Sequence, residues 1–258
     1  MTTNDTNGTK IALITGGSRG LGKSMALHLA DAGVDVVFTY QSKKGAADEL
    51  VAQIAAKGRR AVALQLDAGK TSTFGAFADA VRAALADTWT RDRFDFLVNN
   101  AGIGVHASFA ETTEAQFDEL MNVHLKGPFF LTQRLLPLIA DGGRILMIST
   151  GLARFTFPGY SAYASMKGGI EVLARYLAKE LGPRKISVNT VAPGAIETDF
   201  GGGAVRDNEA MNKMVAGLTA LGRVGLPDDV GGAVAALLAP GSNWITGQRI
   251  EVSGGMLL

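Results

Sequence analysis

The chain has no cysteine among its 258 residues. Disulfide bonds and thiol-based catalysis are therefore excluded, together with metal sites built on thiolates. Histidine is nearly as scarce: His28, His106 and His124 are the three present, and their spacing matches no metal-binding motif. The sequence predicts no catalytic metal.

The chain also lacks an excess of charge and a long hydrophobic run. Its net charge is +1, which gives no reason to expect nucleic acid or another polyanion as a partner. No apolar run approaches the ~20 residues that cross a bilayer. The first ten residues are polar and show no hydrophobic stretch of a signal peptide. We therefore expect a soluble, cytoplasmic protein that does not enter a membrane.

What the chain does contain is an alternation of short apolar runs with longer helical patterns. Runs such as Ile11–Ile14, Phe94–Val98 and Ile186–Val191 are as apolar as strands covered on both faces. Hydrophobic residues make up 47% of the chain, and no internal repeat or linker interrupts it. The pattern predicts one α/β domain over residues 10–258, with a mostly parallel sheet between helices, after a flexible tail at residues 1–9.

A glycine-rich segment, Thr15-Gly-Gly-Ser-Arg-Gly-Leu-Gly22, lies between the first apolar run and the helical pattern Met25–Ala30. In a strand-turn-helix unit, glycines let the backbone approach a ligand closely, and the amino end of the helix attracts an anion. The spacing is Gly-x-x-x-Gly-x-Gly rather than the more usual Gly-x-Gly-x-x-Gly. In this context it indicates a pyrophosphate-binding turn, whereas a merely flexible loop is the alternative.

Tyr163 and Lys167 are four residues apart, so on a helix they share one face. A phenol ionises near pH ~10, and a neighbouring cation lowers that pKa. A pKa of ~7 would require about 4 kcal/mol of differential stabilisation of the phenolate. Lys167, a positive nicotinamide ring and exclusion of water could together supply it. The pair predicts an acid and base at Tyr163, although the same spacing also occurs on solvated helix faces.

These motifs together resemble the short-chain dehydrogenase/reductase family, in its 3-oxoacyl-reductase-like branch. Other landmarks follow in the family's order, including Asn99-Asn-Ala-Gly102, Pro193–Thr198 and Ile245–Gly255, so the resemblance covers residues 9 to 258. It implies a single-domain α/β fold, Rossmann-type, with a doubly wound parallel sheet of about seven strands. It also implies cofactor contacts from Gly16, Ser18, Arg19, Gly20, Leu21, Gly22, Tyr40, Ser42, Asp67, Asn99, Ala101, Gly102, Tyr163, Lys167, Pro193, Gly194, Ile196 and Thr198.

Within that set, the resemblance implies that Asp67 touches the adenine, Asn99 the adenine ribose and Thr198 the nicotinamide end of the cofactor. The choice of cofactor depends on the end of the second predicted strand. An NAD site usually has an acidic residue there for the ribose 2′-hydroxyl, but this chain has Tyr40. Arg19, with the hydroxyl and lysines of Ser42–Lys44, suits a 2′-phosphate. We expect NADP, with NAD as the alternative.

The family's active site combines serine, tyrosine, lysine and asparagine, and this chain departs from it at two positions. Thr150 stands thirteen residues before Tyr163, where serine is usual. Its hydroxyl can still bind a carbonyl oxygen, whereas strand alternation directs Ser149 to the opposite face. The predicted catalytic residues are Thr150, Tyr163, Lys167 and His124.

His124 is the second departure, because asparagine is usual three residues before Gly127. Asn122 lies about 200° away on an α-helix and cannot replace it. The ordinary pKa of histidine, near ~6.5, would let His124 relay protons between Lys167 and solvent. The alternative is a buried histidine that only fills the space.

The resemblance implies interconversion of a carbonyl and a secondary alcohol by hydride transfer. Aromatic residues in Leu152–Tyr160 suggest an apolar or aromatic small-molecule substrate, and we prefer a reductase of free carbonyl compounds. A 3-oxoacyl-[acyl-carrier-protein] reductase is the second hypothesis, weakened because Leu136–Asp141 has no basic residue and Arg184 alone remains of a carrier-binding patch. A nucleotide-binding sensor without catalysis is the third.

Two further expectations concern mobile and assembling parts. Residues 199–217 contain Gly201-Gly-Gly203, which favours a substrate lid, with an ordinary surface loop as the alternative. His106 is expected in a surface loop or at the entrance to the pocket. By resemblance, the protein forms a homotetramer through helices near residues 113–140 and 161–182 and through its C-terminal strand.

Overall fold

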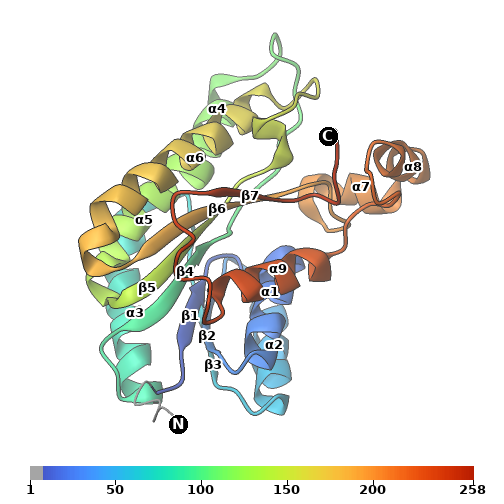
Figure 1. Cartoon of the computed structure of the whole chain (residues 1–258). Helices are drawn as coiled ribbons and strands as arrows, with labels where there is room; N and C mark the ends of the chain where they lie inside the picture. The colour runs from blue at the N-terminus through green and yellow to red at the C-terminus, as the bar shows by residue number, and fades with distance from the viewer. Residues whose placement is uncertain (1–7) are drawn as a thin grey trace.

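The computed structural model describes residues 8–258, so most of the predicted tail at 1–9 lies outside the described residues. Its centre is a seven-stranded sheet with the strand order β3-β2-β1-β4-β5-β6-β7, in which all six neighbouring pairs are parallel (Figure 1). The strands are β1 (Ile11–Ile14), β2 (Asp35–Tyr40), β3 (Ala61–Gln65), β4 (Phe94–Asn99), β5 (Ile139–Ile148), β6 (Ser187–Pro193) and β7 (Arg249–Val252). The predicted doubly wound parallel sheet is confirmed.

Helices cover both faces of this sheet. They are α1 (Gly20–Asp31), α2 (Lys44–Ala56), α3 (Phe74–Trp89), α4 (Glu114–Met121), α5 (Gly127–Leu135), α6 (Ser161–Leu181), α7 (Ala204–Asp207), α8 (Glu209–Gly217) and α9 (Pro227–Leu238). Figure 1 shows α3, α5 and α6 on one side of the sheet and α1, α2 and α9 on the other, with α7 and α8 standing apart from both layers.

The alternation of side chains along β1 builds two separate cores. Ile11 and Leu13 pack with α3, α5 and α6, whereas Ala12 and Ile14 pack with α1, α2 and α9. All four are fully buried, which explains why the strand is a continuous apolar run rather than an alternating one.

The winding of the chain determines where a ligand can bind. The connections after β1 and β4, which are neighbours in the sheet, run over opposite faces through α1 and α5. The carboxyl ends of these strands therefore open a crevice between diverging connections, which is where open parallel sheets bind ligands.

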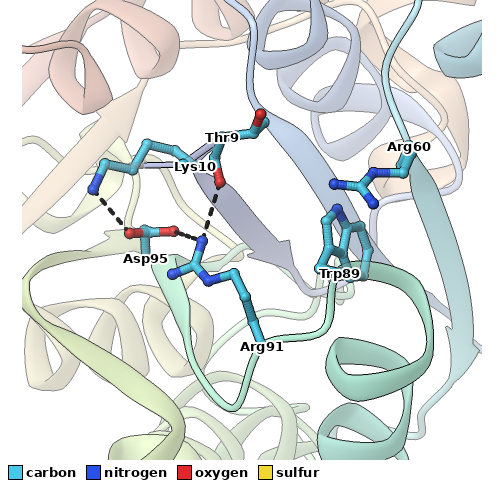
Figure 2. A pocket seen from close by; sticks show the side chains of 7 residues that line it. Thr9, Lys10, Arg60, Trp89, Arg91 and Asp95 are labelled. Carbon is cyan, nitrogen blue, oxygen red and sulfur yellow. Dashed lines mark hydrogen bonds and ion pairs between the residues drawn. The ribbon is translucent and has the colours of Figure 1, made fainter. Parts of the chain in front are cut away.

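A pocket of about 420 Å³ lies at the other edge, beside the amino ends of β1 and β4 (Figure 2). Lys10 and Arg91 both pair with Asp95 there, each at 3.0 Å, so much of its charge is internally compensated. This position separates the pocket from the predicted cofactor and catalytic residues. Across residues 8–258, no helix combines the length and apolar character needed to span a bilayer.

Candidate active site

The glycine-rich turn after β1 requires glycine at specific positions. Gly16 has φ +63°, a left-handed conformation that other residues rarely adopt. A Cβ on Gly17 would lie 2.6 Å from Phe38 Cβ, and one on Gly22 would lie 2.2 Å from the Gly16 carbonyl oxygen. The backbone is thus folded too tightly for side chains, as a pyrophosphate cradle needs.

The turn delivers the amino end of α1 to this cradle. Within the described part of the chain, no side chain caps the first turn of α1, and that turn carries no acidic residue. Its backbone N–H groups and the positive end of the helix dipole therefore favour an anion. These features fit the pyrophosphate of a dinucleotide.

Two residues that the sequence analysis did not single out fix this turn. The Thr15 hydroxyl accepts hydrogen bonds from the backbone N–H groups of Asn100 and Ala101, both at 2.9 Å. The Asn100 side chain donates to the carbonyls of Thr15 and Gly16 at 2.9 and 3.1 Å. The turns after β1 and β4 thus form one unit. The position of Thr15 directly before the glycines was the available signal.

Asn99, the last residue of β4, packs toward α5. Its side chain is buried and donates to the Thr132 hydroxyl at 3.0 Å, on α5. The predicted contact of Asn99 with the adenine ribose stays a prediction, and its backbone groups are the ones left to make that contact. Asp67, by contrast, is exposed at the end of the segment after β3, and Tyr40 and Ser42 flank the end of β2.

The turn after β6 lies across the crevice from the glycine-rich turn. A Cβ on Gly194 would lie 2.9 Å from Ser253 Cα, so the chain crosses the end of β7 closely here. Thr198 is next to Gly20, as a Cβ on that glycine would lie 3.7 Å from the Thr198 side chain. Arg19 faces Asp199, with 3.8 Å between Nη1 and Oδ2.

The four predicted catalytic residues converge at the carboxyl end of β5. Tyr163, on α6, is 7% exposed, and its ring lies edge-on to His124 with 5.1 Å between ring centroids. Lys167 Nζ lies 5.7 Å from the Tyr163 ring centroid. Thr150, just after β5, has its side chain close enough to Tyr163 to lower the pKa of the phenol. Ser149 instead donates to Glu171 Oε1 at 2.6 Å.

The electrostatics of Tyr163 differ from the expectation in one respect. Burial raises the pKa of Tyr163 well above its ordinary value, and the hydrogen bond from Thr150 acts in the opposite direction. Exclusion of water therefore opposes ionisation of the phenol, because it removes solvation from the phenolate. The expectation that exclusion of water would help to lower the pKa of Tyr163 is therefore wrong, because burial raises this pKa.

Lys167 is also buried, and burial lowers its pKa to about 7. Its Nζ donates to the Ile148 carbonyl at 2.7 Å. The amine therefore exchanges its proton near neutral pH, which suits a group that passes protons rather than one that only carries charge.

His124 lies in a π-helical segment, Asn122–Lys126, rather than in an α-helix. The separation of about 200° between Asn122 and His124 holds only for an α-helix, so it does not apply to this segment. Nε2 of His124 lies 2.8 Å from the Ile103 carbonyl oxygen, and Nδ1 is buried without a partner among the described residues. Burial, assisted by nearby Lys167, lowers the His124 pKa to about 3. The imidazole is therefore neutral at physiological pH, and its ordinary pKa gives no support to a relay.

A pocket of about 280 Å³ lies near this cluster: none of the four residues lines it, but Leu152 and Tyr160, which do, also pack in the apolar group that contains Tyr163. It is lined mainly by apolar parts of the loop after β4 and of the segment before α6, including Phe109, Leu152, Phe157 and Tyr160. His106, which is exposed, lies edge-on to Tyr160 with 5.0 Å between ring centroids. Phe200, from the predicted lid, approaches Tyr163 with 5.7 Å between ring centroids.

Comparison with known proteins places this geometry among characterised reductases. A family model described as enoyl-(acyl carrier protein) reductase matches residues 16–257. The hydroxynaphthalene reductase-like protein Arp2 of Metarhizium brunneum is 35% identical, over 95% of this chain and 94% of its own length.

Two solved structures are similar over the whole fold. LugOII, described as a promiscuous reductase that catalyses keto-reduction at C1 during lugdunomycin biosynthesis, is 39% identical, with a TM-score of 0.91 over 96% of this chain and 98% of its own. The angucycline C-6 ketoreductase LanV, solved with bound NADP, is 35% identical, with a TM-score of 0.91 over 96% of this chain and 95% of its own.

Proposed function

The chain belongs to the short-chain dehydrogenase/reductase family, enzymes that act on keto and hydroxyl groups, and from that premise we propose an NADPH-dependent ketoreductase of aromatic ring ketones. The observation that carries this proposal is the convergence of Thr150, Tyr163 and Lys167 near an apolar pocket, at the sheet edge that also carries a tight glycine turn suited to a dinucleotide.

Each catalytic side chain has a role that follows from its surroundings. NADPH, when bound, supplies the hydride that reduces the carbonyl carbon. Tyr163 gives its proton to the carbonyl oxygen. The Thr150 hydroxyl binds that oxygen and stabilises the phenolate left on Tyr163. Lys167, with its pKa lowered to about 7, returns a proton to the site from solvent.

The preference for NADP is supported by Arg19 and by Tyr40, which offers no carboxylate to a ribose 2′-hydroxyl. NADP is bound in LanV. We expect Arg19→Ala to raise the Kd of NADPH roughly 10-fold or more and to change that of NADH little, because a charged hydrogen bond to phosphate contributes about 1.5–3 kcal/mol. Equal losses for both cofactors in titrations of intrinsic fluorescence would contradict this.

The substrate class is supported by the aromatic and apolar lining near Tyr163 and by the relatives. Arp2 is described as a hydroxynaphthalene reductase-like protein, and LanV has also been solved with bound NADP and rabelomycin. NADPH absorbance with bicyclic and polycyclic aromatic ketones, compared with a free and a carrier-linked 3-oxoacyl thioester, tests this. We expect the highest kcat/KM for the ring ketones. A salt-sensitive preference for the carrier-linked thioester would overturn it.

The structure weakens the carrier-protein alternative further. Arg184 donates to Asp141 at 2.8 Å and to the Leu136 carbonyl at 3.0 Å, so its charge is already engaged. The sensor alternative would appear in the same assay as tight NADPH binding without turnover on any compound.

We also propose a homotetramer. Exposed apolar side chains on α5 and α6, Phe129, Phe130, Val172 and Tyr176, and the exposed C-terminal Leu258 support it, because they lie on the helices and chain end expected to meet. The mass in solution by light scattering tests this.

A further inference from the structure

Arg249, the first residue of β7, reaches the end of β5 although β6 lies between these strands. Its Nη2 donates to the Thr150 carbonyl at 2.9 Å, its Nε donates to Glu171 Oε1 at 2.8 Å, and its Nη1 bonds to Glu251. The Arg249 side chain is 21% exposed. Its three nitrogens thus bind three separate acceptors, and the planar guanidinium holds them in fixed directions.

The neighbouring positions at this strand end are held by α6. Lys167 donates to the Ile148 carbonyl, and the Ser149 hydroxyl donates to Glu171, one turn further along the helix. Arg249 binds the next residue, Thr150. Ile148 and Ser149 are therefore hydrogen-bonded to α6, the helix that carries Tyr163, and Thr150 is hydrogen-bonded to β7.

The Thr150 carbonyl and hydroxyl are linked through the following turn. Fixing the carbonyl sets the path of residues 151–153, which form a short helical turn. From that turn, the Leu152 backbone N–H donates to the Thr150 hydroxyl oxygen at 3.3 Å. This bond uses one lone pair of the Thr150 hydroxyl oxygen and holds that oxygen in place, while its proton stays available to Tyr163 or a substrate oxygen.

We propose that Arg249 is a positioning residue for the reduction, which holds Thr150 so that its hydroxyl meets Tyr163 and the substrate carbonyl. The proposal rests on the proposed function, because it assumes catalytic roles for Thr150 and Tyr163. Arg249 acts through Thr150, and Glu171 and Glu251 keep it in place. Lysine could not replace it, since an ammonium cannot bind the same three acceptors in a fixed plane.

The test compares Arg249→Lys with Arg144→Lys. Arg144 is a matched control, because this buried arginine also donates to backbone carbonyls, those of Leu237 and Ala239, and lies within β5, six residues before Thr150. We expect both variants to melt at lower temperature. Only Arg249→Lys should lower kcat, roughly 10-fold or more, because small misplacements of reacting groups cost up to ~100-fold. Its KM for NADPH should stay near that of the wild type.

The pH profile adds a readout that lost stability alone would not move. Alcohol oxidation requires the Tyr163 phenolate, and the hydrogen bond from Thr150 lowers the pKa of Tyr163. A displaced Thr150 should therefore shift the oxidation profile to higher pH. The other titratable groups facing Tyr163 are Lys167 from α6, Tyr160 just before that helix and His124 from the π-helical segment, and the substitution leaves all three present.

If Arg249→Lys matches Arg144→Lys in both kcat and pH profile, Arg249 is only structural and the proposal is overturned. Tyr163→Phe, assayed beside them, separates this from failure of the proposed function: an active Tyr163→Phe would remove both proposals. Should Arg249→Lys fail to fold, Glu171→Gln removes the charge of one Arg249 partner and keeps its shape. We then expect a smaller fall in kcat and a shift of the oxidation pH profile in the same direction, to higher pH. A pH profile identical to that of the wild type would overturn the positioning role of Arg249.

Discussion

At the scale of single residues, burial sets the protonation state of each predicted catalytic group. Tyr163, Lys167 and His124 are all buried, and each is driven toward its neutral form. The sequence could identify these residues by type and spacing. It could not give the sign of the effect of burial on Tyr163, because that depends on how completely the fold excludes water around the ring.

Lys167 gives a prediction about stability. Its folded pKa of about 7 lies below the ordinary lysine pKa of 10.5, so between these pH values the unfolded chain binds more protons. The unfolding free energy contributed by this group should rise with pH across that window, by up to about 1.4 kcal/mol per pH unit. Lys167→Met should flatten this rise in denaturant titrations of the cofactor-free protein. Parallel pH curves for the two proteins would contradict it.

His124 gives a prediction about turnover. A neutral imidazole can accept a proton at one nitrogen while it releases one from the other, and Nδ1 has no protein partner among the described residues. We expect His124→Ala to lower kcat roughly 10-fold or more and to change its pH profile, with NADPH affinity nearly constant. His28→Ala, on α1 and away from the cluster, is the control. An unchanged pH profile in His124→Ala would falsify the relay and leave a space-filling residue.

At the scale of elements, two segments depart from regular geometry beside the site. The first is the π-helical segment Asn122–Lys126. It is followed by Gly127, where a Cβ would lie 2.2 Å from the Ala68 carbonyl oxygen. The second is Phe200–Gly203, where Gly201, Gly202 and Gly203 all have positive φ. The glycines were visible in the sequence, whereas a π-helical segment was not, because a pattern of apolar positions at 3.6-residue spacing does not distinguish it.

Gly202→Ala tests whether this second segment serves the site. Its φ is +75° and a Cβ there would meet open space, so the substitution adds backbone strain alone, about 1–2 kcal/mol. We expect the KM for the carbonyl substrate to rise several-fold, with a small fall in melting temperature. Gly75→Ala, in the open first turn of α3, should instead stabilise the protein by roughly 0.4–1 kcal/mol. If Gly202→Ala leaves KM unchanged, the segment is an ordinary surface loop.

At the scale of the whole molecule, the sequence predicted the fold because its apolar runs are buried on both faces and alternate with helices. The location of the site followed from the parallel arrangement, since every strand carries its motif to the same edge. The Asn99–Thr132 hydrogen bond and the Arg249–Glu171 pair could not be predicted in this way. Each depends on a partner far along the chain, Thr132 for Asn99 and a residue 78 positions away for Arg249.

The proposed reduction depends on Tyr163 as the proton donor. The most direct test is the rate of NADPH oxidation by Tyr163→Phe with the best aromatic ketone of the substrate panel, measured beside NADPH binding. We predict a loss of roughly 100-fold or more in kcat, with the Kd for NADPH nearly unchanged, because the ring that packs against His124 and Phe200 is kept while the acid is removed. A variant that retained most of the wild-type rate would contradict the account.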